Sequence, residues 1–83
     1  MKLDFVIQTE ENQIVSGWSV KPSGDWCKDC DTGAGYAVDL IEHLAASGDM
    51  PLFGRVIRDC ATDQSGIATG FLAQIGQFAA NAA

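Results

Sequence analysis

The sequence of 83 residues predicts a small α+β fold: a three-stranded sheet with two helices packed on one of its faces. Two stretches near the N-terminus alternate apolar and polar residues, as half-buried strands do. Two later stretches repeat apolar residues every three or four positions, as amphipathic helices do. A further alternating stretch lies between them. The expected order is strand, strand, helix, strand, helix (ββαβα) in a single domain of residues 1–83.

The first two strands are expected at Lys2–Thr9 and Ile14–Val20, joined by the polar residues 10–13. In each strand alternate residues share one face, namely Leu3, Phe5 and Ile7 in the first and Ile14, Ser16, Trp18 and Val20 in the second. Two strands joined by a short polar turn form a hairpin. Such a hairpin needs a helix against its apolar face to be stable.

Residues 21–35 read as a long loop, because they contain Pro22, three glycines and the run GDWCKDCDTGAG. A helix is expected at 36–46, ending at Gly48, with a buried stripe of Ala37, Leu40, Ile41, Leu44 and Ala45. The nine residues Leu52–Cys60 are predicted as the third strand, since they alternate between a proline and the next helix cap.

Residues 64–83 carry no charged side chain and are predicted as the helix on which the rest packs. The apolar stripe of this helix has helical spacing and comprises Ile67, Phe71, Ile75 and Phe78. Thr62 or Asp63 is the expected N-cap. A line of small residues on another side of the helix leaves a homodimer contact open as an alternative, whereas the polar residues exclude a membrane span.

The expected core combines these apolar faces. It consists of Leu3, Phe5, Ile7, Trp18, Leu40, Leu44, Val56, Phe71 and Ile75. Eleven acidic against five basic residues give a net charge of −6, which argues against direct binding to nucleic acid or to anionic membranes. The same charge favours a basic protein partner or a cation. The N-terminus does not read as a signal peptide, so a cytoplasmic location is expected.

Three cysteines cannot all pair with one another, so thiols or metal ligands are expected. Cys27 and Cys30 have two residues between them, which suits a metal clamp or a tight disulfide. With His43 and Cys60 they make the ligand count of a structural zinc site, the alternative to having no cofactor. His43 and Cys60 are each isolated in the sequence, whereas typical zinc-binding sequences have two closely spaced pairs of ligands.

The run Trp26 to Cys30 resembles the WCxxC signature of thioredoxin-like oxidoreductases, which place it after a strand and at a helix start. Here the run follows Pro22 and precedes Gly33, so no helix start is expected there, and nearby acids would oppose thiolate formation. A Cys–His nucleophile pair lacks an orienting residue. The glycines before the expected helix lack the lysine of a phosphate loop. The chain is therefore not expected to be an enzyme.

Acidic and aromatic side chains gather between residues 25 and 42. The residues predicted to bind a partner are Asp25, Trp26, Asp29, Asp31, Tyr36, Asp39 and Glu42, and Glu10 and Glu11 add charge in the hairpin turn. Tryptophan and tyrosine are frequent hot-spot residues at protein interfaces. Such a patch would dock on a basic groove that otherwise holds nucleic acid, although acids also serve solubility alone.

In size and in its acidic stretch GDWCKDCD, the chain resembles the small anti-CRISPR inhibitors encoded by phages. That resemblance implies an inhibitor that binds a nucleic-acid-handling complex and blocks its DNA-binding surface. Members of the class differ in fold, so no residue role carries over. The alternative is a small zinc-binding or thiol-redox protein centred on Cys27 and Cys30.

Overall fold

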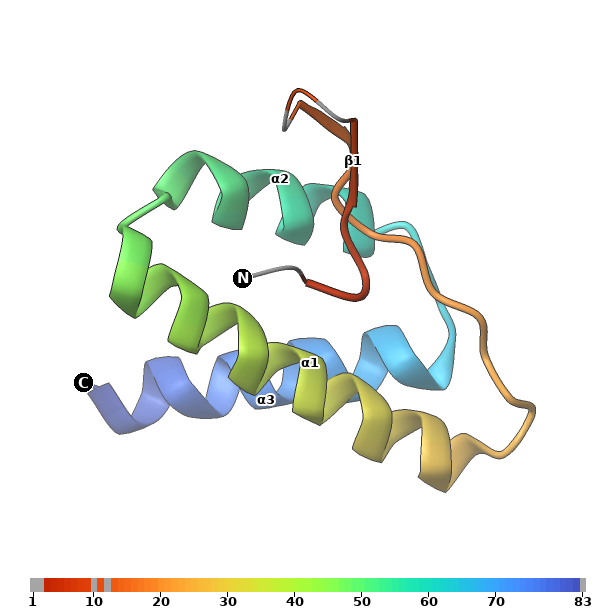
Figure 1. Cartoon of the computed structure of the whole chain (residues 1–83). Helices are drawn as coiled ribbons and strands as arrows, with labels where there is room; N and C mark the ends of the chain where they lie inside the picture. Colours follow the sequence, from red (N-terminus) through yellow and green to blue (C-terminus); the bar gives the residue numbers. More distant parts are fainter. Residues whose placement is uncertain (1–2, 10, 12, 83) are drawn as a thin grey trace.

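The computed structural model describes residues 3–9, 11 and 13–82, and the side chain of Ile14 is not described. Two short strands, β1 (Ile7–Gln8) and β2 (Ile14–Ser16), precede three helices. The helices are α1 (Trp26–Ser47), α2 (Met50–Cys60) and α3 (Gly66–Ala82) (Figure 1). Lys2, Glu10, Asn12 and Ala83, which the predicted elements include, lie outside the described residues.

The helices form two layers, with the N-terminal segment between them. In Figure 1, α1 and α3 lie side by side and run in the same direction, and α2 folds back over the other side of the core. Phe5 enters this space from the N-terminal segment, with its ring centre 5.1 Å from that of Tyr36 and 5.7 Å from that of Phe71. The aromatic core therefore joins the start of the chain to α1 through Tyr36 and to α3 through Phe71.

The predicted three-stranded ββαβα sheet is wrong: the described residues contain a two-stranded antiparallel sheet only. The predicted third strand, Leu52–Cys60, lies within helix α2. Asp49 caps this helix by accepting a hydrogen bond from the Leu52 backbone N–H at 3.2 Å. Pro51 suits a first turn, where its missing N–H is not needed. The buried residues Leu52, Val56 and Cys60 are four apart, which is helical spacing.

The predicted loop at 21–35 is wrong in its second half, because α1 begins at Trp26, ten residues before the expected start. Asp25 is the N-cap, and its carboxylate accepts a hydrogen bond from the Lys28 backbone N–H at 3.2 Å. Gly33 and Gly35, which suggested a loop, lie inside the helix. Gly48 ends it in the left-handed conformation, with φ of 69°, as expected of that residue.

Glycines set the distance between α1 and α3. A Cβ added to Gly33 would lie 1.9 Å from the carbonyl oxygen of Ile67, and one added to Gly70 would lie 2.0 Å from that of Cys30. Both values are far inside van der Waals contact, so any side chain would separate the two backbones. The N-terminal halves of the two helices are therefore in backbone-to-backbone contact.

The helix predicted at 64–83 is confirmed as α3, with Ile67 and Phe71 buried and Ile75 half-buried. The residue that caps its first turn is Ser65, and neither Thr62 nor Asp63 does so. The Ser65 hydroxyl accepts from the Ala68 backbone N–H at 3.3 Å.

Burial confirms most of the expected core. The predicted residues found buried are Leu3, Phe5, Trp18, Leu40, Leu44, Val56 and Phe71. Ile7 is the error, being 46% exposed, because the two-residue strand β1 has no helix against that side chain. Cys60 joins the core with no exposed surface.

Side-chain hydrogen bonds attach the hairpin region to α2 and to the loop that follows it. The Trp18 indole N–H donates to Asp63 at 2.8 Å, and the Gly17 backbone N–H donates to Asp59, also at 2.8 Å. Arg55 donates to the same Asp59 carboxylate and to the Val15 carbonyl oxygen. These contacts fix the N-terminal segment over the core.

Candidate protein-interaction surface

The outer side of α1 carries the exposed acids of the predicted site. Asp31, Asp39 and Glu42 are exposed, and their spacing of eight and three residues places them on one side of the helix. Val38, which is 39% exposed, lies among them. We call these four residues the acidic face. Because α1 packs on α3 through its opposite side, the acidic face points away from the core.

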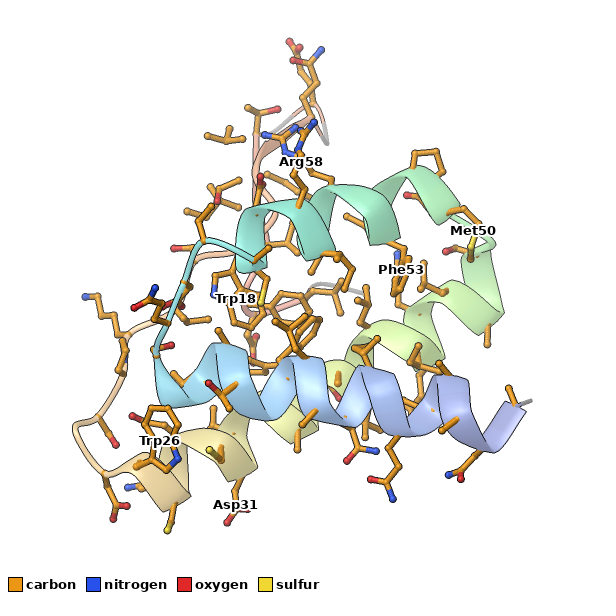
Figure 2. The ribbon with its side chains drawn as sticks, turned by 180° about the vertical axis from the view of Figure 1, so that it is seen from behind. Trp18, Trp26, Asp31, Met50, Phe53 and Arg58 are labelled. Atoms are coloured by element: carbon orange, nitrogen blue, oxygen red, sulfur yellow. The ribbon has the colours of Figure 1, made fainter. Side chains whose placement is uncertain are left out.

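Charge is unevenly distributed around this helix. Residues 29–54 contain five carboxylates and no lysine or arginine. Arg55 and Arg58 lie on α2 near the hairpin, and Figure 2 shows Arg58 at the opposite side of the molecule from Asp31. Arg55 is also paired with Asp59 at 2.9 Å. The acidic face therefore has no basic neighbour on α1 after Lys28.

Two of the predicted partner-binding residues are held inside the fold. Tyr36 is half-buried and packs on Phe5, and its ring centre lies 6.5 Å from that of Trp18. Asp29 is 4% exposed. The other predicted residues, Asp25 and Trp26, are exposed at the start of α1, where Trp26 is 56% exposed (Figure 2).

The Asp29 carboxylate fixes the segment that leads into α1. It accepts hydrogen bonds from the Ser23 hydroxyl at 2.7 Å and from the Ser23 backbone N–H at 3.0 Å. The hydroxyl and then the backbone N–H of Ser23 hold the pKa of Asp29 below its ordinary value, although burial opposes them. Asp29 is thus a structural carboxylate that is unavailable to a partner in this conformation.

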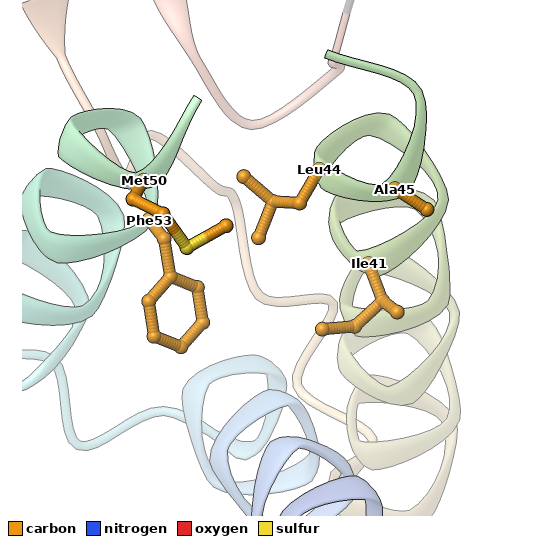
Figure 3. A pocket seen from close by; sticks show the side chains of 5 residues that line it. All are labelled: Ile41, Leu44, Ala45, Met50 and Phe53. Carbon is orange, nitrogen blue, oxygen red and sulfur yellow. The ribbon is translucent and has the colours of Figure 1, made fainter. Parts of the chain in front are cut away.

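An open apolar groove of about 370 Å³ lies where α1 turns into α2. Its lining residues, labelled in Figure 3, are Ile41, Leu44, Ala45, Met50 and Phe53. We call this the corner groove. Met50 is 56% exposed, and Figure 2 shows it beside Phe53 at the end of the molecule opposite Trp26.

The corner groove is flanked by acids from both helices. Glu42 stands three residues before Ala45, which lines the groove, so the two are neighbours on the surface of α1. Asp49, at the N-cap of α2, directly precedes the lining residue Met50, and both acids are exposed. The acidic face and the corner groove thus adjoin at Glu42. Apolar surface bordered by charge of one sign suits an amphipathic segment with charge of the other sign.

The four candidate zinc ligands lie on distant parts of the fold. Cys27 and Cys30 lie at the start of α1, His43 lies near its end, and Cys60 is buried at the end of α2. The rise of a helix separates Cys30 from His43 by about 20 Å along its axis. Among the described residues no three Cys, His, Asp or Glu side chains are grouped as a metal site requires. The same separation keeps His43 from acting on Cys27 as a base.

The WCxxC run does stand at a helix start, contrary to the expectation from its flanking residues. Residues 20–25, which precede it, form no strand, so the context of thioredoxin-like oxidoreductases is only half present. All three cysteines are free thiols, with Cys27 exposed and Cys30 half-buried.

Comparison with known protein families, curated proteins and solved structures finds no match to this chain. Within the described part of the chain, none of the helices combines the length and apolar character needed to cross a bilayer.

Sequence reasoning missed the corner groove because it predicts Phe53 within a strand, Leu52–Cys60, and leaves Met50 outside any element. The signal for it was present in the Asp49-Met50-Pro51 run, in which a capping residue stands two positions before a proline. Reading that run as a helix start places Met50 and Phe53 three apart on one side of α2.

Proposed function

We propose that this protein is a non-catalytic, cytoplasmic interaction module that docks on a basic protein surface through the acidic face and the corner groove. The occupant of the groove is a basic amphipathic segment of the partner. The partner is a nucleic-acid-handling complex, and docking blocks the surface on which that complex holds DNA, as in the anti-CRISPR inhibitors that the chain resembles.

The observation that supports this proposal best is the continuity of exposed acids and apolar surface along α1. Asp31, Asp39 and Glu42 supply charge that steers a basic partner. The groove beyond Glu42 supplies apolar area that leaves water on binding. Charge alone gives weak, salt-sensitive association, whereas an apolar anchor within a charged border is typical of specific interfaces.

A basic surface that binds DNA is the partner type with the matching charge. Such surfaces carry lysines and arginines spaced to neutralise phosphates. Carboxylates spaced along a helix can pair with the same side chains and exclude DNA by occupying them. Binding should therefore weaken as ionic strength rises, because exposed charge pairs are screened beyond about 8 Å at physiological salt.

The test compares two double variants with equal changes in net charge. Asp31→Lys with Glu42→Lys alters the acidic face, and Asp4→Lys with Glu11→Lys alters exposed acids outside it. The wild-type protein captures its partner from host lysate, and the captured complex is purified and bound to labelled DNA. The wild type and each double variant are then titrated into this complex, and release of the DNA is measured. We expect the wild type and the Asp4/Glu11 variant to displace DNA, and the Asp31/Glu42 variant to lose at least about tenfold in affinity, or about 1.4 kcal/mol.

Equal loss in both variants would mean that net charge alone drives association. A captured complex that keeps its DNA at saturating protein would contradict the inhibitor function and leave a binding module of another kind. Circular dichroism of each variant verifies that the helices are retained.

A further inference from the structure

Two thiols stand together at the start of α1. Cys27 and Cys30 are three residues apart, so they share one side of the first two turns of the helix. Both are free, with Cys27 exposed and Cys30 half-buried. The acidic face does not use them, and no third ligand accompanies them among the described residues.

The two cysteines differ in how firmly the fold holds them. The Cys30 carbonyl oxygen faces Gly70 so closely that a Cβ there would lie 2.0 Å from it, which fixes the Cys30 backbone against α3. Cys27 belongs to the first turn, where backbone N–H groups have no partner within the helix. The Asp25 cap adds a 3.2 Å side-chain bond to the Lys28 N–H, and the neighbouring Trp26 lies against Gly66 of α3. Cys27 itself is exposed, so its side chain can turn towards Cys30 without displacing a buried neighbour.

A small movement suffices for the two sulfur atoms to bond. Residues three apart in an α-helix have Cβ atoms about 5–6 Å apart, and a disulfide requires about 3.5–4.5 Å. Tightening the first turn to 3₁₀ geometry brings residues i and i+3 into line and shortens that distance. Helix starts commonly adopt such a turn, so the rest of α1 can keep its contact with α3.

We propose that Cys27 and Cys30 form a reversible disulfide by exchange with a small-molecule disulfide such as glutathione disulfide. Cys27 is the entry thiol because it is the exposed member of the pair, and Cys30 is the resolving thiol. This inference is independent of the proposed partner.

The exchange is balanced in two steps. The Cys27 thiolate attacks one sulfur of glutathione disulfide, forming a mixed disulfide and releasing one glutathione thiolate. The Cys30 thiolate then attacks the Cys27 sulfur, forming the internal disulfide and releasing the second glutathione. The two cysteines lose two electrons and two protons, and glutathione disulfide gains them as two thiols.

Cys60 provides an internal reference. It has no exposed surface, and burial, followed by the nearby Asp63, raises the pKa of its thiol to about 11. A buried, protonated thiol neither attacks a disulfide nor meets one. Cys60 should remain reduced while Cys27 and Cys30 react.

The experiment incubates the folded protein in glutathione buffers of increasing glutathione disulfide fraction. After an acid quench, alkylation and mass spectrometry report the state of each cysteine. We expect the wild type to lose two hydrogen atoms, with Cys27 and Cys30 protected from alkylation together and Cys60 alkylated only after unfolding. Added excess reduced glutathione should restore both thiols.

Three variants separate the steps. Cys30→Ser should stop at a single glutathione adduct on Cys27, Cys27→Ser should form no adduct in the same time, and Cys60→Ser should behave as the wild type. A stable glutathione adduct or an intermolecular dimer in the wild type, without the internal bond, would overturn the proposal. Oxidation of Cys60 at the same rate as Cys27 would overturn it as well.

Discussion

The two ends of α1 are packed in opposite ways. Near the N-termini of both helices, Gly33 and Gly70 allow backbone contact, and no side chain fits between them. Near the C-terminus of α1, the larger side chains of Ile41, Met50 and Phe53 border an open groove. One end is closed by direct backbone contact with α3, and the other borders an open groove towards α2.

With the proposed function, this difference separates stability from partner recognition within one small domain. The closed end leaves no room for change, because any added atom must displace a backbone. The open end already exposes its side chains, so changes there cost little in the fold and alter the surface that is proposed to bind a partner. Substitutions at the two ends should therefore have different effects.

The largest expected effect is at the closed end. Gly33→Ala or Gly70→Ala should destabilise the protein by about 3 kcal/mol or more, because each new methyl overlaps a carbonyl of the other helix. Gly35→Ala and Gly76→Ala are matched controls on the same helices, with open space around the new methyl. They should stabilise by about 0.5–1 kcal/mol through helix propensity. Urea unfolding of the four variants tests the contact, and equal effects would contradict it.

The second effect compares phenylalanines in the core and in the groove. Phe71 has no exposed surface, so Phe71→Ala should cost about 3–5 kcal/mol. Phe53 is half-buried on the groove wall, and Phe53→Ala should cost less than about 2 kcal/mol. Thermal unfolding measures both. A larger loss at Phe53 would mean that the groove is closed in solution.

Lowering the pH should reduce the free energy of unfolding, because protonation of Asp29 removes its hydrogen bonds with Ser23 at the start of α1. The pKa of this carboxyl lies below its ordinary value of 3.8 in the folded state, so its stabilising effect is complete above that value and is lost as pH falls through the lower, folded pKa. Asp29→Asn should flatten the dependence of unfolding free energy on pH below about pH 4. Ser23→Ala, which removes the nearest donor, should raise the pKa of Asp29 in an NMR titration. A pKa of Asp29 that is the same in Ser23→Ala as in the wild type would argue against the Ser23 contact.

The smallest effect on stability is expected at Met50. Met50→Ser should change unfolding free energy by less than about 0.5 kcal/mol, because the side chain is mostly exposed. It should nevertheless weaken partner binding about tenfold. Val15→Ser is the matched control, since Val15 is 59% exposed on the hairpin away from the groove. Calorimetric binding of both variants to the captured partner distinguishes the two surfaces, and equal affinities would contradict a role for the groove.

Sequence patterns predicted α3 and most of the core because their periodicity is unambiguous. Ile67, Phe71, Ile75 and Phe78 repeat at steps of four and three residues, and the odd step from Ile75 to Phe78 would change faces in a strand, so only a helix keeps all four together. Leu52–Cys60 satisfied two patterns, since Leu52, Val56 and Cys60 are both even-spaced and four apart. The Asp49 cap decided for the helix, and length and alternation alone could not.

The start of α1 was missed for a different reason. Gly33 and Gly35 weaken a helix locally, and sequence alone did not indicate that Gly33 is required where α3 crosses. The same error placed Asp29 on an exposed loop, whereas one turn of helix directs it towards Ser23. Asp31, Asp39 and Glu42 were placed on the surface correctly because charged residues rarely lose water without a partner.

By itself the sequence determined the net charge of −6, the uncharged final helix and the apolar residues that form the core. These depend on side-chain chemistry and on local spacing, which each segment carries alone. Only the tertiary structure decided that glycines join α1 to α3, that Asp29 is buried and that a groove opens beside Glu42. Each of these depends on what a distant segment places opposite a residue, and packing between segments is a property that no single segment contains.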